Sequence, residues 1–313
     1  MPRVIAPTEL TPAADICSLG DCLVGLESQG FDPRDEQSLL GAAAWLRRLG
    51  ENRDFLADIM LRELAGRHKA EDAAGAYGPQ VIMLSPLGRE FFIRAAIWPS
   101  PQEHLFRASG GGAFVYELPH DHNFDFLTYG YFGPGYASDY YEYEYEDVAG
   151  AIGERAGLRF VERGQLTPGK IMHYRAHRDV HSQLPPEAMS VSLNVMHAGG
   201  AQGWTDQYRF DCERDEIAGV LSPGATEVFL RIAVGLGGAE AQDLAETFGR
   251  SHPSDRMRLT ALEAQAGMMD PRGQDDLWRR AEASGSRLVA LEATNYRRDL
   301  SNAQAVGETL LAA

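Results

Sequence analysis

Residues 119–125 read Pro-His-Asp-His-Asn-Phe-Asp, and this stretch decides which fold and chemistry the chain is expected to have. Side chains alternate along an extended backbone, so His120 and His122 project from one face and Asp121 from the other. Two imidazoles on one face can reach a single metal ion at about 2.0–2.2 Å. An HxH pair alone is often only part of a polar loop, so a metal site needs further ligands elsewhere in the chain.

More histidines follow within a β-rich region. From about residue 80 to 212, runs of Val, Ile, Phe and Tyr alternate with turn residues such as Gly133-Pro134-Gly135. Many short strands at this spacing are typical of a sandwich or barrel. Six of the nine histidines lie between residues 120 and 197: His120, His122, His173, His177, His181 and His197. The strands are expected at residues 80–84, 90–97, 113–118, 124–132, 140–146, 158–166, 171–174, 190–196 and 207–210.

Helical patterns flank the β-rich region. Residues 1–34 show no clean period and are interpreted as an irregular arm, and two amphipathic helices follow it. Residues 258–264 match residues 287–293 in six of seven positions, which fits stacked HEAT-like hairpins or chance similarity between Ala- and Leu-rich helices. The predicted division is an N-terminal arm with helices at 1–78, a metal-binding β-barrel at 79–221 and an α-helical region at 222–313.

Composition narrows the function classes. The 313 residues are 44% hydrophobic and 24% charged, as in an ordinary globular protein. The formal net charge of −16 repels phosphate backbones and argues against nucleic-acid binding. No apolar run is long enough to span a bilayer, and the N-terminus lacks a secretory pattern, so we expect a cytoplasmic protein. Cys17, Cys22 and Cys212 match no common zinc spacing and are expected to be reduced.

A second segment completes a resemblance to a known family. Pro168-Gly169 predicts a tight turn into a strand, and His181 follows about twelve residues later. Over roughly residues 108–197 the chain resembles the cupin superfamily, whose first motif is HxH, a carboxylate and a glycine, and whose second is a Pro-Gly turn, a strand, a loop and one histidine. The matching residues are His120, His122, Asp125, Gly130 or Gly133, Pro168, Gly169 and His181.

The resemblance implies a mainly β fold, a cupin-like double-stranded β-helix or jelly-roll barrel with N-terminal helices and an α-helical C-terminal region. It also implies that His120, His122 and His181 hold a metal ion. The chain departs from the family at the acid, which is usually a glutamate four or five residues after the second histidine, whereas Asp125 lies three after His122. Asp125 is therefore a metal ligand, a partner that orients a histidine, or a polar strand residue.

Other residues are assigned to a substrate. Seven tyrosines lie between residues 129 and 145 and form either a half-buried strand face or an aromatic wall for a ligand. Tyr129 or Tyr131 can serve as a proton donor. Arg175 or Arg178, in the loop that leads to His181, can pair with an anionic substrate group.

Histidine and carboxylate ligands with open positions suit Fe(II) most, although Zn, Mn, Ni or Cu also fit. The cupin resemblance then favours a non-haem iron oxygenase acting on a small organic substrate. No arginine follows His181 by about ten residues, which argues against a 2-oxoglutarate cosubstrate. The alternatives are a Zn- or Mn-dependent isomerase or lyase and a non-catalytic binding module. The helical C-terminal region is a candidate surface for a homodimer or another protein partner.

Overall fold

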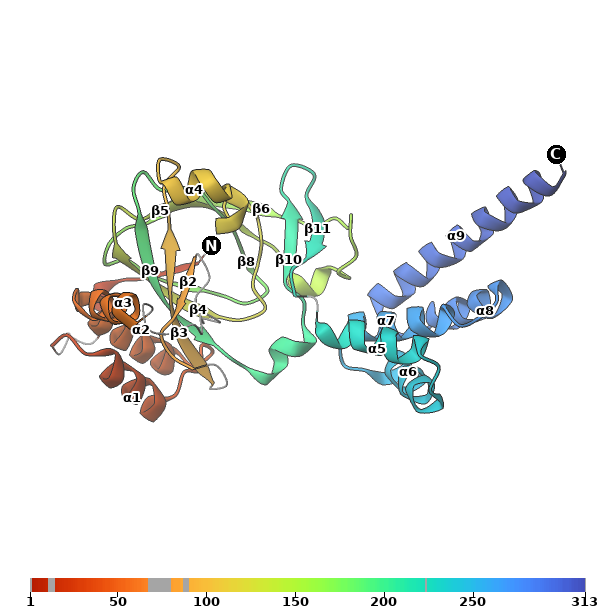
Figure 1. The fold of residues 1–313 in the computed structure, drawn as a ribbon, viewed down its shortest axis with the longest axis horizontal. Helices are drawn as coiled ribbons and strands as arrows, with labels where there is room; N and C mark the ends of the chain where they lie inside the picture. Colours follow the sequence, from red (N-terminus) through yellow and green to blue (C-terminus); the bar gives the residue numbers. More distant parts are fainter. Residues whose placement is uncertain (1, 11–14, 67–79, 87–89, 223, 313) are drawn as a thin grey trace. The chain divides into compact units, whose positions relative to one another are not determined.

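The computed structural model describes residues 2–10, 15–66, 80–86, 90–222 and 224–312 (Figure 1). The chain divides into two compact units. The sheet unit comprises residues 1–145, 157–202 and 209–215, and the helical unit comprises residues 146–156, 203–208 and 216–313. The N-terminal helices therefore group with the strands. The domain boundaries proposed from the sequence at 78/79 and 221/222 stay predictions.

The sheet unit contains two antiparallel sheets. Sheet A has the strand order β1-β7-β4-β9-β3-β2, and sheet B has the order β6-β5-β8. The strands of sheet A are β1 (Arg3–Ile5), β2 (Val81–Met83), β3 (Phe91–Trp98), β4 (Phe126–Phe132), β7 (Ile171–Tyr174) and β9 (Ser190–His197). Those of sheet B are β5 (Tyr136–Glu142), β6 (Arg159–Leu166) and β8 (Asp179–Gln183).

Sheet A separates two cores because successive side chains of a strand point to opposite faces. In β4, Phe126 packs into a core shared with sheet B, to which Tyr140 of β5 also belongs. The next residue, Leu127, packs into the core formed with the helices. Those helices, α1 (Leu19–Gln29), α2 (Glu36–Glu51) and α3 (Phe55–Gly66), lie beside β3, β4 and β9 in Figure 1. The face between the two sheets is thereby closed off from the helices.

Local sequence explains where the helices begin. The Ser18 hydroxyl accepts a hydrogen bond from the Asp21 backbone N–H at the start of α1, and the Asp35 carboxylate accepts one from the Ser38 N–H at the start of α2. Such caps satisfy backbone donors that have no partner inside the helix. Along α2, the apolar residues recur every three or four positions and are fully buried against sheet A: Leu39, Ala42, Ala43, Leu46 and Leu49.

Several sequence-based expectations about these elements are wrong. The strand expected at 113–118 is absent, because the 3-10 helix η2 (Gly111–Phe114) occupies its start and Val115 and Glu117 adopt left-handed conformations with φ of 57° and 56°. The strand expected at 140–146 begins earlier and ends at Glu142. The arm expected at 1–34 contains β1 and α1, and the loop expected before and around His181 contains β8.

The predicted fold class is confirmed only as antiparallel sheets flanked by helices, and the finer topology is not. The β-rich middle of the chain forms antiparallel sheets flanked by helices at both ends, but helices occupy more of the described residues than strands do. Over the described residues the strands form separate sheets and not a closed barrel. The double-stranded β-helix stays a prediction.

The helical unit is built around α5 (Ala225–Gly235), α6 (Ala239–Ser251), α7 (Asp255–Ala266), α8 (Pro271–Ala281) and α9 (Arg287–Ala312). Trp278 of α8 stacks on Tyr296 of α9 at a centroid distance of 4.4 Å within one apolar core. The matching segments 258–264 and 287–293 lie in α7 and α9, but their equivalent residues differ in burial, since Leu262 is 8% exposed and Leu291 is 41% exposed. Among the described residues, no helix is long and apolar enough to cross a membrane.

The packing of α2 on sheet A generates a first prediction. Replacing the fully buried Leu46 by Ala should lower the free energy of unfolding by about 2–5 kcal/mol, because the change removes apolar contacts and leaves a cavity. Leu61→Ala, on the exposed side of α3, is the matched control and should change it by less than about 0.5 kcal/mol. Urea unfolding followed by circular dichroism measures both, and equal effects would contradict the described packing.

Candidate metal centre

Three buried histidines converge in the sheet unit. His120 and His122 lie in an irregular segment before β4, and His181 lies in β8. One ring nitrogen from each lies within 4.8 Å of the others, and the three rings are 3–7% exposed. The Nε2 atoms of His122 and His181 are 3.1 Å apart. The structure therefore brings together the three histidines that the sequence assigns to a metal.

Backbone hydrogen bonds hold the two parts of this triad together. The His120 N–H donates to the His181 carbonyl at 3.0 Å, and the His181 N–H donates to the His120 carbonyl at 2.9 Å. The His177 N–H donates to the His122 carbonyl at 2.8 Å, with His177 itself in a left-handed conformation at φ 57°. The HxH segment is thus anchored on β8 by pairing at one residue, although it does not form the strand expected from its sequence.

The protonation of His120 follows from its partner. Its Nδ1 lies 2.7 Å from the Leu118 carbonyl oxygen, which can only accept, so Nδ1 carries the hydrogen. In the neutral ring, Nε2 then keeps a lone pair for a metal. Such a carbonyl contact fixes both the tautomer and the orientation of a ligating histidine.

Burial keeps all three rings neutral. It lowers the pKa of His120 from its ordinary 6.5 to about 4, and it lowers the pKa values of His122 and His181 well below that ordinary value. The neighbouring His120 and the positive charge of Arg94 lower the pKa values of His122 and His181 further. Neutral imidazole is the form that ligates metals, so the triad is ready for a metal ion near neutral pH.

The geometry fits one transition-metal ion. Two nitrogens at about 2.1 Å from one ion and roughly at right angles to each other lie about 3 Å apart, and the His122 and His181 Nε2 atoms have this separation. Three imidazoles suit iron, zinc, copper and nickel better than magnesium or calcium. Among the described residues, the group of potential ligands contains these three histidines and no carboxylate.

Aromatic side chains line the triad. His122 stacks on Phe124 and meets Phe126 edge-on, each at a centroid distance of 4.9 Å, and His181 lies 4.8 Å from the Tyr174 ring. Asp121, which was expected to point away, is fully buried and accepts a hydrogen bond from the Tyr143 hydroxyl at 2.5 Å. Aromatic rings therefore pack against His122 and His181, and all three histidines are buried from solvent.

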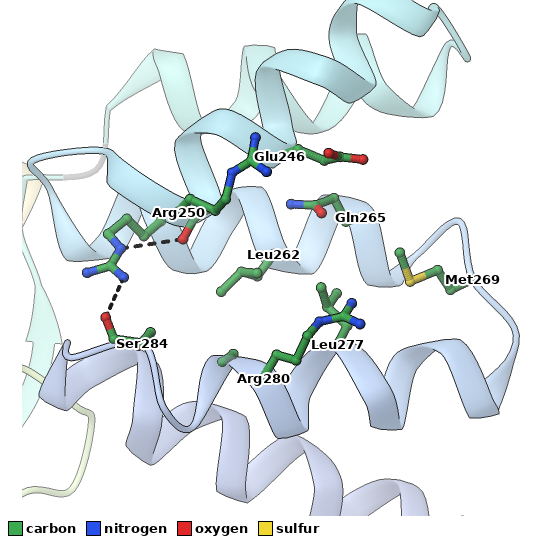
Figure 2. A pocket seen from close by; sticks show the side chains of 11 residues that line it. Glu246, Arg250, Leu262, Gln265, Met269, Leu277, Arg280 and Ser284 are labelled. Atoms are coloured by element: carbon green, nitrogen blue, oxygen red, sulfur yellow. Dashed lines mark hydrogen bonds between the residues drawn. The ribbon is translucent and has the colours of Figure 1, made fainter.

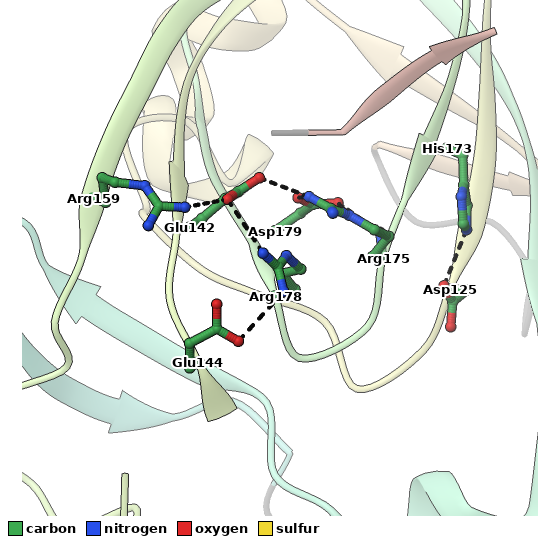
Figure 3. Close-up of polar contacts among 8 residues, drawn as sticks. All are labelled: Asp125, Glu142, Glu144, Arg159, His173, Arg175, Arg178 and Asp179. Atoms are coloured by element: carbon green, nitrogen blue, oxygen red, sulfur yellow. Dashed lines mark hydrogen bonds and ion pairs between the residues drawn. The ribbon is translucent and has the colours of Figure 1, made fainter. Parts of the chain in front are cut away.

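Asp125 is not brought to the triad. Its carboxylate pairs with His173 Nε2 at 3.0 Å (Figure 3). Phe126 faces the core between the sheets, so the residues on either side of it, Asp125 and Leu127, face the other way. His173 lies opposite Leu127 in the ladder and shares that outer face. The structure therefore places Asp125 with His173 and not in the group of the three histidines.

Arg175 is also placed elsewhere. Its guanidinium pairs with Asp179 at 2.6 Å and with Glu142 at 2.8 Å (Figure 3). Arg178 completes the same network through Glu142 and Glu144. These carboxylates hold the pKa of Arg175 above its ordinary value and neutralise its charge. The structure therefore does not offer Arg175 as a binding group for an anionic substrate.

The tyrosines near the centre are not the predicted ones. Tyr129 and Tyr131 lie on the helix-facing side of β4, and the Tyr131 hydroxyl donates to the backbone carbonyls of Asn52 and Arg53. Tyr140 and Tyr174 belong to the core between the sheets, where their hydroxyls lie 3.0 Å apart. Side chains alternate along β4, so a buried Phe126 already indicates that Tyr129 faces away from this core. Tyr140 lies opposite His181 because β5 pairs with β8, and the sequence alone does not reveal that pairing.

A cavity of about 510 Å³ lies in the helical unit (Figure 2). It is lined by apolar side chains such as Leu262 and Met269 and by three arginines, of which Arg258 donates to the Gly249 and Ser284 carbonyls. It has no histidine or cysteine in its lining, so it offers no counterpart to the triad.

Comparison with known proteins gives no family assignment from sequence. No family model and no curated protein sequence matches the chain. Solved structures that resemble it include the DMSP lyase DddQ from Ruegeria pomeroyi DSS-3, with 10% identity, a TM-score of 0.23 and coverage of 65% of this chain and 83% of that one. A structure of the DMSP lyases RdDddP and RnDddQII has 10% identity, a TM-score of 0.26 and coverage of 66% and 86%.

Cobalt(II) HppE in complex with Tris buffer also resembles the chain, with 10% identity, a TM-score of 0.20 and coverage of 57% of this chain and 96% of that one. Identities near a tenth and TM-scores of this size describe only a distant likeness. The chemistry proposed below therefore rests on the geometry of the triad.

The second prediction concerns metal content. The protein should take up about one divalent transition-metal ion per chain, and His122→Ala or His181→Ala should weaken binding by at least about a hundredfold, because one of three ligands is lost. His104→Ala, at an exposed histidine, and Asp125→Asn should both keep the metal. Elemental analysis after dialysis, with circular dichroism to verify folding, is the measurement. A folded His122→Ala protein with full metal content would refute the centre.

The third prediction concerns pH. His120 has a depressed pKa in the folded, metal-free protein, so the unfolded chain binds more protons between about pH 6.5 and pH 4. The chelator-treated protein should therefore lose stability as the pH falls through this range, with about 3 kcal/mol coming from His120 alone. Denaturant titrations at several pH values should show a smaller loss for His120→Gln, while His104→Gln should behave as the wild type. If the free energy of unfolding of His120→Gln fell with pH as steeply as that of the wild type, His120 would not be a buried neutral ring.

Proposed function

We propose that this chain is a metal-dependent enzyme of the cupin type, a non-haem Fe(II) oxygenase that acts on a small organic substrate. The observation that carries the proposal is the convergence of His120, His122 and His181, three buried and neutral imidazoles with no carboxylate in their group among the described residues. Three protein ligands leave coordination positions open. Open positions on a histidine-ligated iron are the arrangement that non-haem oxygenases use.

His120, His122 and His181 would hold the Fe(II) ion, which would supply the electrons for O₂ and open positions for a substrate. The protein orients the histidine rings and keeps water away from them. The Leu118 carbonyl fixes the His120 ring, and Phe124 and Phe126 hold His122 from two sides. Exclusion of water strengthens every electrostatic interaction at the centre and protects reactive species from side reactions.

The Tyr140 and Tyr174 pair is the proposed proton donor. Burial raises the pKa values of both phenols, so both stay protonated near neutral pH. Their hydroxyls share one hydrogen bond of 3.0 Å. When Tyr140 donates to Tyr174, the Tyr174 hydroxyl hydrogen is available to a substrate beside His181. This role replaces the one that the sequence assigned to Tyr129 or Tyr131.

The fourth prediction tests the reaction class. The protein is loaded anaerobically with Fe(II), mixed with a panel of small organic acids, amines and alcohols, and monitored with an oxygen electrode. We expect substrate-dependent O₂ uptake without 2-oxoglutarate, and a loss of at least about tenfold in Tyr174→Phe at unchanged iron content, because a positioned proton donor contributes on the order of a hundredfold.

The zinc-loaded protein is the matched control, since zinc cannot transfer electrons to O₂. Substrate turnover by the zinc form with no O₂ uptake by the iron form would replace the proposal by a Lewis-acid lyase or isomerase. Metal binding without turnover of any kind would favour a binding module. Decarboxylation of 2-oxoglutarate by the iron form would contradict the expectation that the reaction needs no such cosubstrate.

A further inference from the structure

A row of polar side chains crosses sheet A on the face that points to sheet B. In β3, the residues Phe92, Ala96 and Trp98 belong to or pack against the core between the sheets, and Arg94 shares their face by alternation. The ladder places Arg94 opposite Asn194 of β9, and Asn194 opposite Thr128 of β4. Arg94, Asn194 and Thr128, here called the polar row, therefore lie side by side on three neighbouring strands.

Two members of the polar row have buried polar atoms without the partners that such atoms normally have. Arg94 Nε and Thr128 Oγ1 are shielded from solvent and have no hydrogen-bond partner among the described residues. No carboxylate in the described part of the chain pairs with Arg94, whereas Arg175 has two such partners, Glu142 and Asp179. A buried charge without a counterion is costly, and an arginine stays charged even so. Burial correspondingly lowers the pKa of Arg94.

The polar row lies next to the metal centre. One step along the strands, Phe92, Met196, Phe126 and Tyr174 form the adjacent row. Phe126 and Tyr174 of that row touch the His122 and His181 rings, as described above. The positive charge of Arg94 also acts on all three histidines of the triad. A molecule a few atoms long that touches the polar row with one end can reach the triad with the other.

Sheet B adds two acceptors to the same core. Ser138 Oγ and Gln183 Oε1 are buried and have no partner in the described residues, and they lie opposite each other in the β5-β8 ladder. The Gln183 amide nitrogen lies 3.3 Å from the His181 ring. Polar atoms without partners on sheet A and on sheet B therefore face a common interior. This arrangement is typical of a site that a polar ligand completes.

We infer that Arg94, supported by Thr128 and Asn194, binds a carboxylate of the molecule that reacts at the triad. The inference rests on the proposed function for its reacting end and names the substrate class as short organic acids. The fork of a guanidinium donates two parallel hydrogen bonds to a carboxylate and supplies its counterion, and the Thr128 hydroxyl and Asn194 amide supply further donors. The carboxylate can belong to the substrate itself or to an acidic cosubstrate such as 2-oxoglutarate.

The test measures carboxylate binding directly. Propionate, succinate and 2-oxoglutarate are titrated calorimetrically into chelator-treated and zinc-loaded protein, with propionamide as the uncharged counterpart of propionate. We expect saturable binding of at least one carboxylate, weakened at least about tenfold in Arg94→Gln and partly restored in Arg94→Lys. Propionamide should not distinguish these proteins. Arg163→Gln, at an exposed arginine paired with Asp139 on sheet B, is the matched control and should bind as the wild type.

Each outcome decides the inference. Equal carboxylate affinity in wild type and Arg94→Gln, or no saturable carboxylate binding by the wild type, overturns it. Where Arg94→Gln fails to fold, Thr128→Val keeps the size of the side chain and should weaken binding in the same direction, and unchanged binding in that variant overturns the inference.

Arg94-dependent binding of 2-oxoglutarate in preference to propionate and succinate supports the subsite and assigns its carboxylate to a cosubstrate. Arg94-dependent binding in a protein that takes up no metal supports the subsite while the proposed function fails. A metal-loaded protein that consumes O₂ but binds carboxylates equally with and without Arg94 leaves the function standing and removes the inference.

Discussion

Two backbone hydrogen bonds between His120 and His181 hold the candidate centre together. The HxH segment has no strand of its own, so its orientation depends on isolated pairings, of His120 with His181 of β8 and with Arg209. The pairing places the His120 ring beside the His181 ring. The hydrogen bond from the His177 N–H to the His122 carbonyl holds the third histidine, His122, in position. Buried backbone groups must find partners, so this pairing also satisfies donors that a loop would otherwise leave open. Packing around the triad then follows from where these three residues are fixed.

The charges around the centre are unevenly distributed. Burial removes the positive charge from the three histidines, while the positive charge of Arg94 remains inside the same core. The Asp125 carboxylate pairs with His173 on the helix-facing side of sheet A, whereas Glu142 and Asp179, which share a strand face with Tyr140 and His181, are paired with Arg175. A divalent ion on the triad adds two further positive charges without a protein carboxylate in the described group. An interior of this kind attracts an anionic ligand, since paired charges are far less costly to bury than single ones.

The sequence predicts the triad because each of its three histidines belongs to a short sequence motif. The HxH spacing and the Pro168-Gly169 turn before His181 are features of short segments. The faces of the strands are harder to predict, because a shift of one residue in register exchanges the two faces. Asp125, Tyr129 and Tyr131 were assigned to the centre by closeness in sequence, and the burial of Phe126 toward sheet B places all three on the opposite face. Tyr174 and Tyr140 belong to different sheets and meet only where the two sheets pack against each other.

Arg175 and Arg94 also show that closeness in sequence does not identify the residues near the centre. Arg175 lies six residues before His181 and was the natural choice for an anion, but its neighbours Asp179 and Glu142 already neutralise it. Arg94 lies far from every ligand in sequence, on a strand whose apolar neighbours suggest only a core. Its importance emerges from a missing counterion, which can be recognised only when the surrounding side chains are in place. A charge that the fold leaves unpaired beside a prepared set of metal ligands is more informative about a substrate than a charge that the fold has satisfied, because only the former gains free energy when the substrate arrives.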